Sequence, residues 1–179
     1  MSYVGRMNVV PLTRVTPGNL RDPLHRVMSG SSPKAVAVVD AMLLAEGGIG
    51  TAGSVAAQFG LRNRFDLANW LTREGLPPLH ELAGWVSVLL WIELCTRTGM
   101  SLCDLALRRG RDPAACYRLV QRVTGQKWST VRARGTGWVL DRFAARCRER
   151  QLPANGTGVG SSLLLPALSG KPDLVANSD

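Results

Sequence analysis

A pattern of small residues and glycines occurs twice in this chain, fifty residues apart, and it constrains the fold more than any other feature. The corresponding pairs are Thr51 and Ser101, Ala56 and Ala106, Gly60 and Gly110, and Gly75 and Gly125. In each copy a hydroxyl residue suited to an N-cap precedes a short helical segment, a glycine ends that segment, and a second helical segment runs to the second glycine. One copy is common among helix pairs, but two aligned copies predict two similar helix pairs.

The second copy shows the turn most clearly. Gly110 can adopt the left-handed conformation that ends a helix, and Asp112 and Pro113 suit the N-cap and first position of the next one. Apolar residues recur at helical spacing on both sides: Leu102, Leu105 and Ala106 before the turn, and Cys116, Leu119, Val120 and Val123 after it. Two short helices joined by a tight turn are typical of a helix-turn-helix, whose second helix lies in the DNA major groove.

The rest of the chain also favours helices, so the predicted fold class is all-α. Further helical segments are expected at residues 34–46, 52–59, 63–73, 79–98, 128–134 and 138–150. Residues 1–31 contain prolines and glycines without a sustained period, which predicts an irregular or disordered arm. After residue 150 the composition shifts to Gly, Ser, Asn and Pro, which predicts a flexible tail over residues 151–179. Within that tail SSLLLPALSG is an alternative candidate for a docking peptide.

The net charge of +9 is concentrated in one part of the chain. Residues 101–150 hold twelve Lys or Arg against four Asp or Glu, which gives +8. By the same count residues 1–50 carry +2, residues 51–100 carry zero and residues 151–179 carry −1. A concentrated basic region indicates a polyanionic partner, with DNA or RNA first, although a merely solvated basic surface is the alternative.

The cysteines do not have the spacing of a metal site. Cys95, Cys103, Cys116 and Cys147 form no Cys-x-x-Cys pair, so no metal is predicted and they are expected to be small buried side chains in a reducing cytoplasm. No apolar run of signal-peptide length begins the sequence. The apolar stretch at residues 82–94 is bounded by Glu81 and Glu93 and is too short to cross a membrane, so no membrane partner is expected.

No motif predicts an enzyme or a bound cofactor. Residues 48–53 satisfy the G-x-G-x-x-G pattern, but a dinucleotide site needs a strand immediately before it, and a helical pattern precedes this one. No nucleophile–base pair and no pair of carboxylates has supporting context. The expectation is a non-enzymatic protein without a cofactor.

Three consecutive stretches carry a resemblance to a known family. They are SVAAQFGLRNRFDLANWLTREGLPPL, HELAGWVSVLLWIELCTRTGMSL and CDLALRRGRDPAACYRLVQRVTGQKWSTVRARG. Both helix-pair stretches contain Ala followed four residues later by Gly, and each second helix ends at Gly. With these features residues 34–135 resemble the DNA-binding domain of the AraC/XylS transcriptional regulators, in particular the shorter, stand-alone members.

The resemblance implies a double helix-turn-helix domain over residues 32–150, with two helix-turn-helix subdomains joined by a long linker helix. The chain departs from the family at Gly110-Arg111 and Cys116, where phenylalanines are usual. In the first motif the core triplet Leu67, Trp70 and Leu71 also follows its glycine one residue later than expected. The two turns are therefore expected to differ in length by one residue.

The residues expected to contact DNA lie on the open faces of the two second helices. On the first they are Arg64, Phe65, Ala68 and Asn69. On the second they are Ala114, Tyr117, Arg118 and Gln121, flanked by Arg111 and Arg122. The guanidinium of Arg118 matches the O6 and N7 edge of guanine, whereas Gln121 and Asn69 could each read adenine.

Further arginines are expected to bind phosphates, which fix the register on DNA without reading sequence. They are Arg108, Arg109, Arg111, Arg132 and Arg134. Because most of this charge lies in the second motif, that motif is expected to supply more of the electrostatic affinity.

The sequence therefore predicts a bacterial-type transcriptional regulator that binds double-stranded DNA at two successive major-groove segments. RNA polymerase is a further candidate partner. Two alternatives remain: a helical protein-interaction module or adaptor of the transcription machinery that reads no sequence of its own, and a recombinase-type DNA-binding fragment. The operator, the sign of regulation, an effector and the oligomeric state are not encoded in any recognised pattern.

Overall fold

A computed structural model describes residues 18–151, and in this range the chain forms eight helices and no strand. The predicted all-α class is thus confirmed. In chain order the helices are α1 (Gly18–Val27), α2 (Pro33–Leu44), α3 (Ala52–Gln58), α4 (Arg64–Arg73), α5 (Leu79–Thr98), α6 (Leu102–Arg108), α7 (Pro113–Thr124) and α8 (Trp128–Gln151). The predicted tail over residues 151–179 is wrong at Gln151, which is the last residue of α8, and residues 152–179 lie outside the described residues.

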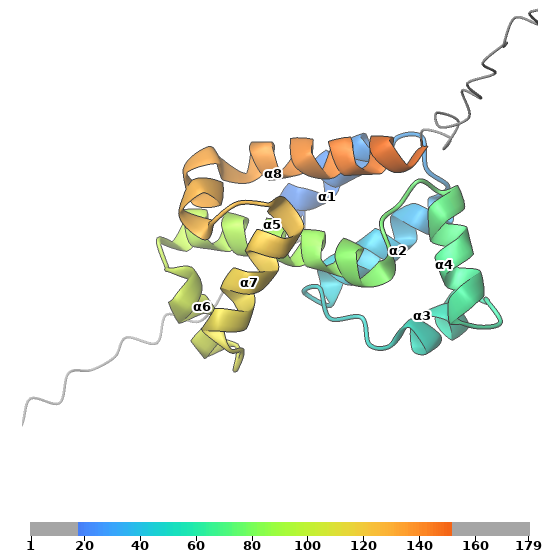
Figure 1. Cartoon of the computed structure of the whole chain (residues 1–179), viewed down its shortest axis with the longest axis horizontal. Helices are drawn as coiled ribbons and strands as arrows, with labels where there is room; N and C mark the ends of the chain where they lie inside the picture. Colours follow the sequence, from blue (N-terminus) through green and yellow to red (C-terminus); the bar gives the residue numbers. More distant parts are fainter. Residues whose placement is uncertain (1–17, 152–179) are drawn as a thin grey trace, which may run out of the picture.

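The long helix α5 is the centre of the molecule. It packs against α2, α7 and α8, with α3 and α4 near its beginning and α6 and α7 near its end (Figure 1). Leu82, Val86, Leu89 and Ile92 are fully shielded from solvent. Burial on several sides explains why α5 is apolar around most of its circumference instead of along one stripe.

Helix α5 also has the length and composition of a membrane span. Its most apolar window has a mean hydropathy of 1.2, but 67% of that window is buried within the protein. Such burial is typical of the central helix of a globular core, which has to be apolar on several faces.

The prediction of an irregular arm over residues 1–31 is wrong for residues 18–27, which form α1; residues 1–17 lie outside the described residues. Leu20, Leu24 and Met28 are buried, because α1 packs on α8 and α2. Asp40 of α2 accepts hydrogen bonds from Arg21 (2.9 Å) and pairs with the Nε2 atom of His25 (2.8 Å). Packing and these polar contacts outweigh the helix-weakening Pro23 inside α1.

The last helix, α8, contains a kink. Gly135 has φ 77° and ψ −178°, outside the helical region, so the two helices predicted at residues 128–134 and 138–150 are confirmed as two arms of one bent helix. Val131, Val139 and Phe143 are buried along it. The bend lets both arms follow the core.

Three of the four cysteines, Cys95, Cys116 and Cys147, are buried, as predicted, and Cys103 is partly exposed. Burial raises the pKa of the Cys95 and Cys116 thiols, and burial together with the nearby charge of Glu81 raises the pKa of Cys147 to about 12. These thiols are protonated near neutral pH. Within residues 18–151 no group of three or more His, Cys, Asp or Glu side chains is arranged to hold a metal ion.

Candidate nucleic-acid interface

The fifty-residue repeat of the sequence is also a repeat of backbone geometry. After α3 the amide of Leu61 donates to the carbonyl of Ala56 (2.8 Å), and after α6 the amide of Arg111 donates to the carbonyl of Ala106 (2.9 Å). Gly60 and Gly110 have left-handed φ values of 68° and 63°. The helix pairs α3–α4 and α6–α7 therefore leave their first helix by the same turn.

The second helix of each pair is capped by a side chain at the end of this turn. Asn63 accepts hydrogen bonds from the amides of Phe65 and Asp66, and Asp112 accepts from those of Ala114 and Ala115. Asn63 follows Gly60 by three residues, whereas Asp112 follows Gly110 by two. The predicted one-residue difference between the turns is confirmed.

On α4 the structure separates a buried face from an exposed one. Leu67, Trp70 and Leu71 are buried, as predicted. The four candidate DNA-contacting residues, Arg64, Phe65, Ala68 and Asn69, are all exposed. Phe65 is 64% exposed, and the Arg64 guanidinium lies 4.9 Å from the centre of its ring. The exposed face thus begins with an aromatic side chain covered by a cation.

On α7 Cys116, Val120 and Thr124 are buried, with Leu119 and Val123 partly buried against the core. The candidate residues Ala114, Tyr117, Arg118, Gln121 and Arg122 are exposed. Arg118 lies 3.4 Å from Asp112, and both side chains are more than half exposed. An ion pair so long and so exposed is weak, so Arg118 is free to exchange Asp112 for another partner.

Arg109 does not fit its expected role as a phosphate contact. Its guanidinium pairs with Glu46 at the end of α2, and its side chain is only 16% exposed. The sequence could not indicate this pair, because the partners are 63 residues apart. The structure makes Arg109 a link between α6 and the end of α2.

The other basic candidates remain accessible to different extents. Arg108, Arg132 and Arg134 are exposed, whereas Arg111 is partly buried with its guanidinium 5.9 Å from the Trp91 ring. Arg132 and Arg134 lie on the first arm of α8, and Arg134 covers Trp138 at 4.9 Å. They are thus separate from the two helix pairs.

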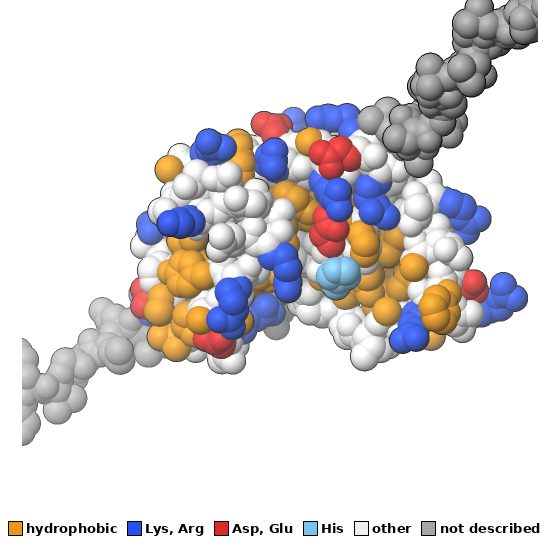
Figure 2. Space-filling model, viewed as in Figure 1, with side chains coloured by type: hydrophobic (Ala, Val, Ile, Leu, Met, Phe, Trp, Pro, Cys, Tyr) orange, Lys and Arg blue, Asp and Glu red, His pale blue; other side chains and the backbone are white. Residues whose placement is uncertain are grey.

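Helices α4 and α7 run in the same general direction, with their N-terminal ends at the lower edge of Figure 1. Lys and Arg side chains spread over α7 and α8 on the face in view, and apolar and basic side chains lie together where α4 begins (Figure 2). The N-terminal ends of both second helices therefore lie toward the same edge of the molecule.

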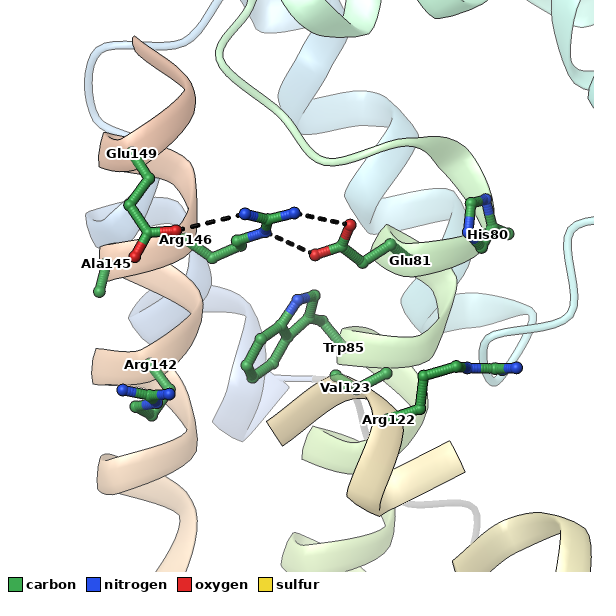
Figure 3. Close-up of a pocket in the computed structure, with 9 residues that line it drawn as sticks. All are labelled: His80, Glu81, Trp85, Arg122, Val123, Arg142, Ala145, Arg146 and Glu149. Carbon is green, nitrogen blue, oxygen red and sulfur yellow. Dashed lines mark hydrogen bonds and ion pairs between the residues drawn. The ribbon is translucent and has the colours of Figure 1, made fainter. Parts of the chain in front are cut away.

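Arg122 lies on the rim of a cavity of about 320 Å³ between α5, α7 and α8 (Figure 3). Arg146 of α8 donates to Glu81 of α5 at 2.7 and 3.3 Å and to Glu149 at 3.2 Å. Burial alone would raise the pKa of Glu81, but the hydrogen bonds and charge of Arg146 outweigh it and hold that pKa below its ordinary value. This ion pair ties α8 to α5 beside the C-terminal half of α7.

Two basic residues of the α3–α4 pair are absent from the predicted set. Arg62 and Arg73 line a shallow cavity of about 490 Å³ together with Asn69. Arg62 also donates to Asp66 at 3.1 Å. The repeat could have indicated Arg62, which follows Gly60 by two residues as Arg111 follows Gly110 by one, whereas it gives no signal for Arg73.

Comparison with known proteins found no family model, no curated protein and no solved structure that matches this chain.

Proposed function

We propose that this chain is a sequence-specific DNA-binding transcriptional regulator in which α3–α4 and α6–α7 act as two helix-turn-helix units. Helices α4 and α7 would enter two successive segments of the major groove. The observation that carries the proposal is that the first helix of each pair ends in the same way, with a left-handed glycine at Gly60 or Gly110 and a hydrogen bond back to a buried alanine carbonyl. The AraC/XylS resemblance of residues 34–135 agrees with this arrangement.

The side chains of the two second helices have complementary roles in this proposal. Arg118 reads guanine, Asn69 and Gln121 read adenine, and Phe65 and Ala68 offer apolar contact to thymine methyl groups. Arg108 and Arg111, with Arg132 and Arg134 on α8, contact phosphates. Arg109 is left out, because Glu46 already holds its guanidinium.

A salt titration tests this proposal. Fluorescence anisotropy with a duplex selected from random sequences should give a log–log slope of affinity against salt of about −4, as expected for the four proposed phosphate contacts at about −0.9 each. Arg108→Gln should make the slope less steep by about 1. Arg26→Gln, which removes the same charge from the exposed surface of α1, is the matched control and should leave the slope unchanged. Binding that is insensitive to salt, or no duplex binding, would contradict the proposal.

A protein-interaction module is the second candidate function. Phe65 and Leu107 are 64% and 62% exposed, and they would supply apolar contacts to a partner surface. Such a module would bind its partner with little salt dependence and would select no duplex sequence, so the same titration separates the two functions.

A further inference from the structure

A mostly apolar groove of about 310 Å³ lies between α4 and the beginning of α5. Leu67 and Leu71 are buried beneath it, Leu79 is partly buried, and Phe65 and Ala68 lie at its exposed side. The ring of Phe65 is 64% exposed, so apolar surface beside the groove is left in contact with water. A further apolar group could remove that surface from water.

The last residues that the structure describes, Arg150 and Gln151, lie at the edge of this groove. Arg150 lines it, donating from Nε to the carbonyl of Leu76 (3.0 Å) and from Nη2 to the hydroxyl of Thr72 (3.4 Å). The side chain of Gln151 lies so close to Gly75 that a Cβ there would be 2.2 Å from its Cγ. The residues that follow Gln151 therefore start beside the C-terminal end of α4.

The sequence that follows contains a segment suited to an apolar groove. LLLPAL at residues 163–168 is the longest apolar run after Gln151, and residues 152–170 carry no charge. Residues 152–162 can span up to about 40 Å when extended, which exceeds the length of α4. A segment tethered in this way acts at an effective concentration in the millimolar range, so even a weak site would be occupied.

We propose that residues 163–168 dock into the groove between α4 and α5 of the same molecule and cover Phe65 and Ala68. Arg64, Phe65 and Ala68 are also the residues that the proposed function assigns to DNA, so docking and DNA binding exclude each other. This consequence rests on the proposed function, whereas the docking itself does not. The C-terminal segment would then be an autoinhibitory element released by DNA.

The docking is tested without DNA, by comparing amide NMR spectra of the full-length chain and its variants. Leu163→Ser, Leu164→Ser and Leu165→Ser combined should shift the amides of Phe65, Ala68, Leu71 and Thr72, because the covering segment leaves the groove. The matched control is Leu174→Ser with Val175→Ser, which removes apolar residues of the same tail outside the run and should leave those amides in place.

The consequence is tested by duplex affinity. The triple variant should bind the selected duplex at least about threefold more tightly than the unchanged chain, because an occupied tethered site competes with DNA. The control variant should match the unchanged chain.

The outcomes distinguish the two proposals. Shifts at α4 without duplex binding by any variant would support docking and contradict the DNA-binding function. Superimposable spectra of the triple variant and the unchanged chain would overturn the docking proposal. If dilution of the unchanged chain moves the α4 amides to their positions in the triple variant, the groove is filled by the tail of a second copy. That result would overturn docking within one molecule.

Discussion

The two helix pairs share a backbone pattern but differ in charge. Residues 51–75 hold three Arg against one Asp and one Glu, a net +1, and residues 101–125 hold five Arg against two Asp, a net +3. In both pairs the first helix nevertheless ends with a left-handed glycine and with a backbone hydrogen bond to the carbonyl of Ala56 or Ala106. Small residues and caps thus maintain the geometry, while surface charges are free to diverge.

The pairs also differ in how they are held on the rest of the molecule. The α6–α7 pair packs closely on α5, since a Cβ on Gly84 would lie 2.8 Å from Val123. The α3–α4 pair is held at its far end, where Glu74 accepts a hydrogen bond from the amide of Ser32 (2.9 Å) and Lys34 lies 5.6 Å from the Trp70 ring. We infer that α7 has the more rigid position.

The largest expected effect is on stability, at the small residues common to both pairs. Ala56 and Ala106 are 1% and 2% exposed. Ala56→Leu and Ala106→Leu should each lower the free energy of unfolding by about 1–3 kcal/mol, because a well-packed site has no room for three more carbons. Urea denaturation measures the effect. The control is Ala57→Leu, which places on the exposed surface the residue that Leu107 already provides in the second pair. A neutral change at either buried alanine would mean that the two pairs are packed differently.

The second prediction concerns sequence reading by the basic pair. Arg118→Ala should cost about 1–3 kcal/mol of binding free energy on the selected duplex and relax the preference at one base position. Arg108→Ala, which lies before the turn, should cost less and leave the preference intact. Anisotropy with a set of single-base duplex variants measures both. Equal weakening of all duplexes by Arg118→Ala would make this residue a phosphate contact.

The third prediction tests whether the two turns are energetically equivalent. Gly60 and Gly110 have open space around them, so a side chain there meets only the strain of positive φ. Gly60→Val and Gly110→Val should each cost about 1–2 kcal/mol of unfolding free energy. Asn tolerates this conformation better, so Gly60→Asn and Gly110→Asn should cost less. If the free energy of unfolding fell for the variants of only one glycine, the two turns would not be energetically equivalent.

Much of this fold could be predicted because local signals agreed with one another. Caps at Thr51, Ser101 and Asp112 and the glycines after each short helix marked the boundaries, and the helical spacing of Leu67, Trp70 and Leu71 marked an inward face. The inward and outward faces of α4 and α7 follow from that spacing.

The parts that sequence reasoning missed depend on contacts between distant segments. Helix α1 carries the buried residues Leu20 and Leu24, and Met28 follows its end, but Pro23 interrupts the pattern expected of a helix. The helix is stabilised by packing on α8 and α2 and by the ion pairs with Asp40 of α2. The local sequence predicts that Arg109 is an exposed basic residue, but in the fold its guanidinium pairs with Glu46 and its side chain is largely buried. Such pairings are set by tertiary packing and leave no local pattern.

The spacing of the DNA site determines whether both helix pairs can bind one duplex at the same time. Two helices reading successive major-groove segments need those segments on one face of the duplex, about 34 Å apart. Inserting about five base pairs between the two halves of the selected site rotates one half to the opposite face, whereas inserting about ten restores the alignment. Anisotropy should show a loss of affinity with the first insertion and a partial recovery with the second. Equal affinity for all three duplexes would contradict the claim that both helix pairs bind DNA together.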